Sequence, residues 1–190
     1  MTIDYSATTV QEALDLADAR HWTQQPPRSD RARLRFLLRR NGHDPKALAA
    51  RLGTTANTLE QALQQRRIGD PQLQRSVQRE VVRLWQPRVR QQAHAAIIRH
   101  DGEMTIAFRA WFGFTVAAGS SDDPRLRFLT VQLKNPYPRL LFDARHRQAD
   151  EQELQRILAD ALAVSYFKHA RTTTLQSVSL TNIDYLEFYY

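Results

Sequence analysis

The chain has 190 residues, with 27 Lys and Arg against 20 Asp and Glu, which gives a formal net charge of +7. It contains no cysteine, which excludes disulfide frameworks and zinc sites built on thiolates. No apolar run approaches the roughly 20 residues of a membrane span, and the first ten residues lack the basic start and apolar core of a secretory signal. We therefore expect a cytoplasmic protein with one large or two small domains.

The positive charge is spread unevenly along the chain. Residues 1–95 hold 16 basic and 9 acidic side chains, whereas residues 96–190 hold 11 of each. Clustered positive charge is typical of phosphate binding, while a basic surface kept for solubility would be spread evenly. Of the 27 basic residues, 24 are Arg, which makes two-pronged contacts to phosphate and guanine. The charge distribution favours nucleic-acid binding by the N-terminal half.

The first hundred residues have the periodicity of helices. Apolar residues recur at helical spacing over 10–20 and 30–40, and two Pro residues interrupt the loop between these segments. Further helices are predicted over 46–52, around Leu59 and Leu63, from Gln72 to Pro87, and over 88–100. We expect residues 1–100 to form one all-helical domain.

The segment from Lys46 to Leu63, KALAARLGTTANTLEQAL, predicts a helix-turn-helix. Gly53 stands where a left-handed turn is favourable for Gly, and Thr54 or Thr55 can cap the next helix. The second helix of such a motif enters the major groove of DNA. The alternative is an ordinary helical hairpin in a core. The predicted DNA-contacting residues are Thr54, Thr55, Asn57, Thr58, Gln61, Gln64, Arg66 and Arg67.

The second half reads as α+β with a small, mostly antiparallel sheet. Residues 103–118 alternate as in a half-buried strand, with Gly113 at a bulge or bend. Residues 118–124 read as a loop, and residues 125–133 are ambiguous between helix and strand. Helices are predicted over 136–147 and 150–168, followed by strands over 172–180 and 183–189 that a Thr181-Asn182 turn joins. We expect this domain to span residues 101–190.

Few residues suggest catalysis or metal binding. The six His are scattered, and no glycine-rich phosphate loop occurs. The Asp122-Asp123 pair is expected to cap a helix that begins at Pro124, with a divalent-ion site as the alternative. We therefore expect no metal site. One hydroxyl remains, that of Thr115 after Trp111-Phe112-Gly113-Phe114, although a Thr at this place can also be an ordinary strand residue.

Several segments together resemble one family. They are WQPRVR (85–90), FGFT (112–115), AAGSSDD (117–123), RLLFDA (139–144), YFK (166–168) and TNIDYLEF (181–188). In this order they are similar to the telomere-protecting terminal proteins of linear Streptomyces-type chromosomes and plasmids. The resemblance covers nearly the whole chain from about Ala13.

The resemblance implies a protein that is covalently attached to the 5′ ends of linear DNA and serves as a protein primer. A telomere-associated protein recruits such proteins to the single-stranded 3′ overhang, and a DNA polymerase adds the first nucleotide to a side-chain hydroxyl. Within the motif FGFT that hydroxyl is Thr115. Rival acceptors are Ser120 and Ser121, and then Tyr189 and Tyr190.

These implications agree with the absence of catalytic motifs. The Mg²⁺ ions of nucleotidyl transfer arrive with the polymerase and the dNTP, so the primer needs no cofactor of its own. Trp111, Phe112 and Phe114 are expected either to stack on unpaired bases or to belong to the core. Such a protein is expected in the cytoplasm, on the nucleoid at replicon ends. The alternative function is a helix-turn-helix transcriptional regulator with a C-terminal dimerisation or ligand domain.

Overall fold

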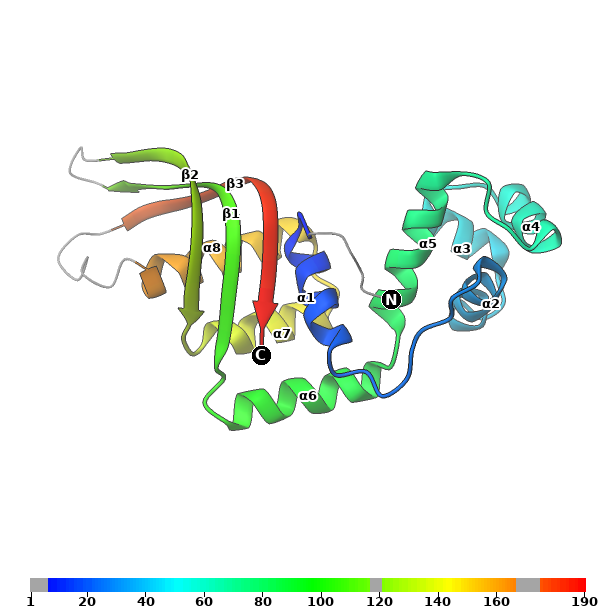
Figure 1. Cartoon of the computed structure of the whole chain (residues 1–190), viewed down its shortest axis with the longest axis horizontal. Coiled ribbons are helices and arrows are strands. Elements are labelled where there is room, and N and C mark those ends of the chain that lie inside the picture. Colours follow the sequence, from blue (N-terminus) through cyan, green and yellow to red (C-terminus); the bar gives the residue numbers. More distant parts are fainter. Residues whose placement is uncertain (1–6, 117–120, 167–174) are drawn as a thin grey trace. The chain divides into compact units, whose positions relative to one another are not determined.

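The computed structural model describes the backbone of residues 7–116, 121–166 and 175–190, and their side chains except those of 114–116, 121–124 and 175–179. This part of the chain is α+β, with eight helices that lie mostly in the N-terminal half and a three-stranded antiparallel sheet (Figure 1). Two compact units are present. We call residues 22–87 the helical unit, and residues 1–21 with 88–190 the sheet unit.

The helical unit contains α2 (Asp30–Arg40), α3 (Pro45–Leu52), α4 (Ala56–Gln65) and α5 (Pro71–Leu84). Each helix begins after a polar residue whose side chain accepts a hydrogen bond from a backbone N–H of the first turn, and these residues are Ser29, Asp44, Thr55 and Asp70. The helices enclose one core, whose fully buried members include Leu34, Leu37, Leu48, Leu59 and Val77.

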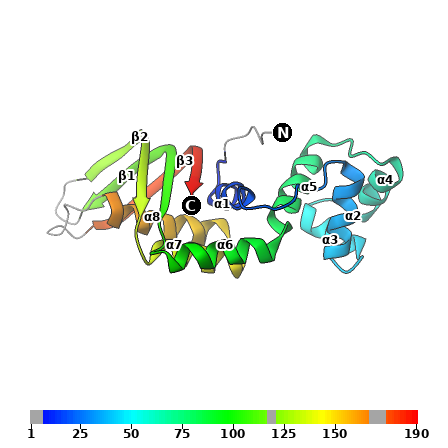
Figure 2. The same cartoon turned by 60° about the horizontal axis from the view of Figure 1, so that its bottom comes forward.

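The sheet unit is built around β1 (Met104–Val116), which lies between β2 (Ser121–Leu133) and β3 (Leu175–Tyr189). Its helices are α1 (Val10–Ala19), α6 (Pro87–Arg99), α7 (Tyr137–His146) and α8 (Glu151–Tyr166). Figure 2 shows α7 and α8 beneath one face of the sheet. The inward face of β1 carries Ile106, Phe108, Ala110 and Phe112, all fully buried, which confirms the alternation predicted for this strand.

None of the described helices covers the other face of the sheet (Figure 2). Three large apolar side chains on it are exposed, Trp111 on β1 by 44%, and Leu126 and Phe128 on β2 by 45% and 69%. Monomeric proteins rarely expose a group of large apolar side chains unless that surface binds a partner or a ligand. We call this surface the open face.

The two units do not follow the expected boundary near residue 100. Helices α1 and α6 belong to the sheet unit. Val10, Ala13, Leu14 and Ala17 of α1 are buried in the same core as the sheet, and Ile97 and Ile98 of α6 pack against that core. Their apolar spacing predicts a helix but carries no information about which element the helix packs against.

Three local predictions were also wrong: the turn at Thr181-Asn182, the loop over 121–124 and the helix that begins at Pro124. Residues 175–189 form a single strand, and Asn182, at φ 48°, lies where the pairing with β1 shifts register between Arg109 and Trp111. The Thr181-Asn182 turn is thus a bulge within one strand. Residues 121–133 form β2, so Asp122-Asp123 does not cap a helix at Pro124. The predicted strand residues 172–174 and loop residues 118–120 lie outside the described residues.

In the described part of the chain, the helices are too short or too polar to span a lipid bilayer.

Candidate nucleic-acid interface and priming site

The segment from α3 to α4 consists of two short helices joined by a turn at Gly53. Helix α3 ends at Leu52, and Gly53 adopts a left-handed φ of 69° that disfavours any side chain. Thr55 then caps α4, because its Oγ1 accepts a hydrogen bond from the Thr58 N–H at 3.2 Å. Leu48 and Leu59 are fully buried, so both helices face the core of the helical unit as expected.

Helix α4 presents a polar face on the side opposite its buried residues. Asn57, Gln61 and Gln64 follow one another at spacings of four and three and are exposed, while Leu59 and Ala62 are buried. Thr54 and Thr58 are half-buried. The hydroxyl of Thr55 is exposed but engaged with that of Thr58 at 2.8 Å. Amide side chains in such a row are suited to reading base edges.

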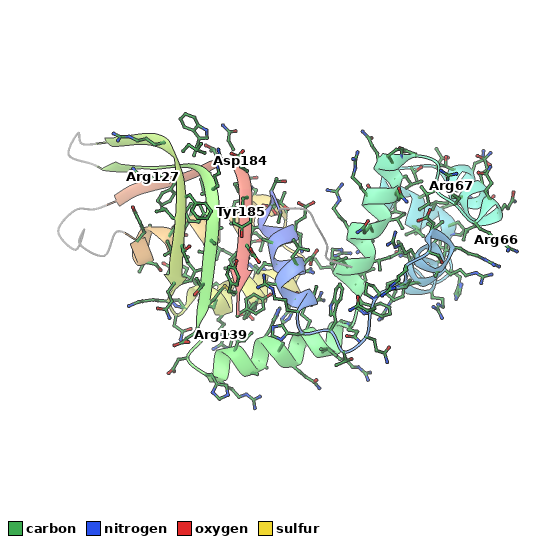
Figure 3. All side chains as sticks on the ribbon, in the orientation of Figure 1. Arg66, Arg67, Arg127, Arg139, Asp184 and Tyr185 are labelled. Carbon is green, nitrogen blue, oxygen red and sulfur yellow. The ribbon has the colours of Figure 1, made fainter. Side chains whose placement is uncertain are left out.

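Two arginines extend this polar face beyond the end of α4. Arg66 caps the helix in a left-handed conformation at φ 57°, and both Arg66 and Arg67 are exposed (Figure 3). The turn is held by the Ile68 N–H, which donates to Asp30 Oδ2 of α2 at 3.0 Å. Neither arginine forms an ion pair among the described residues, so both can contact phosphate.

The charge is divided more unevenly between the two units than between the two halves of the sequence. The helical unit holds 13 Lys and Arg against 5 Asp and Glu, an excess of eight, whereas the sheet unit holds 14 against 15. The positive charge of the whole chain therefore belongs to the helical unit, which also carries every predicted DNA-contacting residue. This is the distribution expected when one unit binds a polyanion and the other does not.

The predicted priming hydroxyl lies at the far end of the central strand. Thr115 is the penultimate residue of β1, and its backbone pairs with Ser121 of β2 and Ser177 of β3. Gly113, two residues earlier, lies where the pairing with β2 shifts register, as the predicted bulge requires. Of the rival acceptors, Ser121 begins β2 and Ser120 lies outside the described residues.

The tyrosine rivals differ in their surroundings. The hydroxyl of Tyr190 donates to Asp18 Oδ1 at 2.8 Å, and burial together with Asp18 raises the pKa of this phenol well above its usual range. A phenol that is buried and difficult to ionise is a poor acceptor for a nucleotide. Tyr189 is exposed by 43%, and the guanidinium of Arg20 lies 4.7 Å from its ring centroid.

The predicted stacking residues separate into two groups. Phe112 is fully buried and belongs to the core of the sheet unit, the second of the two alternatives expected for it. Trp111 lies on the open face, and the side chain of Phe114 is outside the described set. Sequence reasoning missed Phe128, which is 69% exposed, the largest fraction among the described large apolar residues, and whose ring lies 6.3 Å from that of Tyr185 across the sheet. Its position became apparent only when residues 125–133 proved to be a strand.

A buried charge network joins three helices of the sheet unit. Asp18 of α1 is its centre: one carboxylate oxygen accepts from Tyr190 and lies 2.6 Å from His94 Nε2 of α6, and the other lies 3.7 Å from Arg90 Nε. Beside it, Arg145 of α7 pairs with Asp15 of α1. Asp15, Asp18, His94 and Arg145 are buried, so their charges are compensated by one another more than by water.

Within this network burial raises the pKa of Asp15 to about 7, although the positive charge of Arg145 acts in the opposite direction. Because the folded-state pKa exceeds the unfolded value, the contribution of Asp15 to stability is complete below about pH 4 and is lost as the pH rises through about 7. We expect the free energy of unfolding of Asp15→Asn to fall less than that of the wild type between pH 5 and pH 8. Over this pH range the decrease in the free energy of unfolding, measured by urea titration, should be about 2–3 kcal/mol larger for the wild type than for Asp15→Asn.

Asp160→Asn is the control for this pH dependence, since Asp160 is an exposed carboxylate 3.5 Å from Arg156 on the same helix. Asp160→Asn should show the same decrease in the free energy of unfolding with rising pH as the wild type. His146, whose pKa burial lowers, contributes in the opposite direction but is present in all three proteins. Parallel pH profiles for Asp15→Asn and the wild type would contradict the assignment.

The network brings together two of the six histidines that are scattered in the sequence. His94 Nδ1 lies 3.3 Å from His146 Nε2, although 52 positions separate the two residues in the chain. No local sequence pattern predicts this contact. Across the described residues, no group of three or more His, Asp or Glu has an arrangement that could hold a metal ion.

Comparisons with protein-family models, with curated proteins and with solved structures found no match to this chain. The family resemblance therefore rests on the sequence motifs alone.

Proposed function

We propose that this chain is a terminal protein of linear DNA, which binds a replicon end and supplies the hydroxyl of Thr115 as the primer for DNA synthesis. In this proposal α3 and α4 form a helix-turn-helix, and the helical unit binds the DNA. A telomere-associated protein recruits the chain, and a DNA polymerase supplies the catalytic cleft and the Mg²⁺ ions. The observation that carries the proposal is the confinement of the whole positive charge excess to the helical unit.

The position of Thr115 supports the second part of the proposal. It lies near one end of the central strand, where both neighbouring strands pair with it. A strand anchored in a buried core holds its end in a defined place, which favours delivery of a hydroxyl to an external active site. The motif FGFT, which carries the family resemblance, ends at this residue.

The proposal is tested by incubating the full chain with a linear terminal DNA that has a 3′ overhang, a DNA polymerase of the same cell and one labelled dNTP. We expect label that stays on the protein after denaturation and depends on the template. A transcriptional regulator would instead select an internal palindromic duplex and acquire no label. That outcome would overturn the proposal.

If α4 reads base edges, Asn57→Ala and Gln61→Ala should each weaken binding to the terminal duplex by about 1–3 kcal/mol. Binding to an unrelated duplex should change little, because neither side chain carries charge. Gln72→Ala on α5, which also removes an exposed amide, is the control. Fluorescence anisotropy with both duplexes measures the effect. Equal losses on the two sequences would show that α4 does not read the base sequence.

If unpaired bases of the overhang stack on the open face, Trp111→Ala and Phe128→Ala should each weaken binding to single-stranded DNA by about 1–3 kcal/mol. Leu126→Ala is a matched control, because this side chain is as exposed as Trp111 but has no aromatic ring. Titration of a short labelled oligonucleotide measures the affinity. A loss for Leu126→Ala as large as for Trp111→Ala would identify the open face as a general apolar docking surface.

A further inference from the structure

A shallow basic hollow lies along α2 in the helical unit. It has a volume of about 700 Å³, and its lining includes Pro27, Arg31, Arg35, Leu38, Arg39 and His43. Arg31, Arg35 and Arg39 follow one another every four residues and thus share one side of the helix, about 6 Å apart along its axis. We call these three residues the arginine row.

The other arginines of α2 are engaged differently. Arg33 donates from Nε to the carbonyl of Pro27 at 3.0 Å and lies 3.7 Å from Asp30, and Arg40 lies over the ring of Phe36 at 5.5 Å. Among the described residues, no member of the arginine row forms an ion pair. The row is therefore a line of cations that no acidic side chain in the described part of the chain neutralises.

The row comes close to the end of α4 at Arg31. The pKa of Arg31 is lowered because the positive charges of Arg35 and Arg66 repel its own charge. An anion placed among them relieves this repulsion and releases its own counterions. A surface that gathers like charges without acidic partners is suited to a polyanion that contacts several of them at once.

We propose that the arginine row binds the phosphodiester backbone of DNA and thereby positions α4 over its site. This inference rests on the proposed DNA binding, and adds a second, sequence-independent contact surface to it. The occupant is a nucleic-acid backbone because the cations form a line that leads to Arg66, and a small anion engages only one or two of them. Phosphate contacts of this kind set orientation and register, while α4 reads the sequence.

The test compares two double variants of the full chain. Arg35→Gln/Arg39→Gln removes two charges from the row, and Arg75→Gln/Arg79→Gln removes two exposed charges at the same spacing from α5 of the same unit. Duplex affinity is measured from about 50 to 200 mM salt, on the terminal sequence and on an unrelated one. For the row variant we expect the slope of log K against log salt to become shallower by about 1.8, equally on both duplexes. For the α5 variant we expect a change below about 1.

A second variant, Arg31→Gln/Arg39→Gln, spares Arg35 and should reproduce the row effect, so that the result does not depend on one pair of substitutions. The inference is overturned if both row variants keep the wild-type slope of log K against log salt. It is also overturned if the slope of the α5 variant changes as much as that of the row variants. A third outcome also overturns it: the wild type binds inorganic phosphate tightly, the row variants lose this binding, and their duplex binding stays unchanged. Failure of the wild type to bind any duplex defeats the proposed function itself, which keeps the two failures distinct.

Discussion

Thr115→Ala is expected to reduce the transfer of the first nucleotide to this protein to the level seen without polymerase. In the proposed reaction Oγ1 of Thr115 attacks the α-phosphorus of a dNTP. The bond between the α-phosphorus and the bridging oxygen breaks, pyrophosphate leaves, and the hydroxyl proton passes to solvent or to a base of the polymerase. Alanine has no oxygen, so no phosphoester bond can form at this position.

Matched variants make this prediction specific. Thr115→Ser keeps the hydroxyl and should retain transfer. Ser121→Ala removes the hydroxyl of the residue whose backbone pairs with Thr115, and should be labelled like the wild type. Duplex binding should be unchanged in all three variants, because Thr115 and Ser121 belong to the sheet unit. Persistent label on Thr115→Ala together with loss on Ser121→Ala would move the acceptor to Ser121.

The second large effect is expected for Asp18→Ala, which should lower the free energy of unfolding by about 3–5 kcal/mol. One buried carboxylate accepts the hydrogen bond of Tyr190, lies against His94 and faces Arg90. Its removal leaves these groups without their common partner in a region closed to water. Urea denaturation at neutral pH measures the loss.

Asp18→Asn keeps the shape and one acceptor oxygen, so its loss should be smaller than that of Asp18→Ala. Asp143→Ala is the surface control, since Asp143 lies 3.8 Å from Arg139 in an exposed pair within α7 and should cost less than about 1 kcal/mol. If Asp18→Ala unfolds as easily as Asp143→Ala, the network does not stabilise the sheet unit.

Local features of the fold were predictable because local physics determines them. The alternation from Ile106 to Phe112 predicts one buried face of a strand, and Gly53 and Thr55 predict the turn between α3 and α4. The exposed face of α4 followed from the same periodicity, since residues opposite Leu59 must face outward.

Features that depend on distant partners were not predictable in the same way. Thr181-Asn182 has the composition of a hairpin turn, and only its pairing with β1 shows that it is a bulge. Asp18 and His94 are 76 positions apart, and no sequence pattern near either residue predicts their contact. The apolar stripe of α1 is compatible with either core, and tertiary packing decides between them.

The arginine row illustrates an intermediate case. Its spacing is visible in the sequence, but Asp30 and Phe36 show which arginines of α2 already have other contacts. Only the fold separates Arg33 and Arg40 from the three that line the hollow. The charge excess in the sequence indicates a polyanionic partner, and the structure assigns that excess to one unit.

The most direct measurement is mass spectrometry of protein isolated with the ends of linear DNA from cells that contain this chain. After nuclease and trypsin digestion, the account predicts a peptide spanning residues 110–125 that carries one deoxynucleoside monophosphate, with fragment ions that place it on Thr115. Terminal DNA that is free of this polypeptide, or that holds it only through non-covalent contacts, would contradict the account.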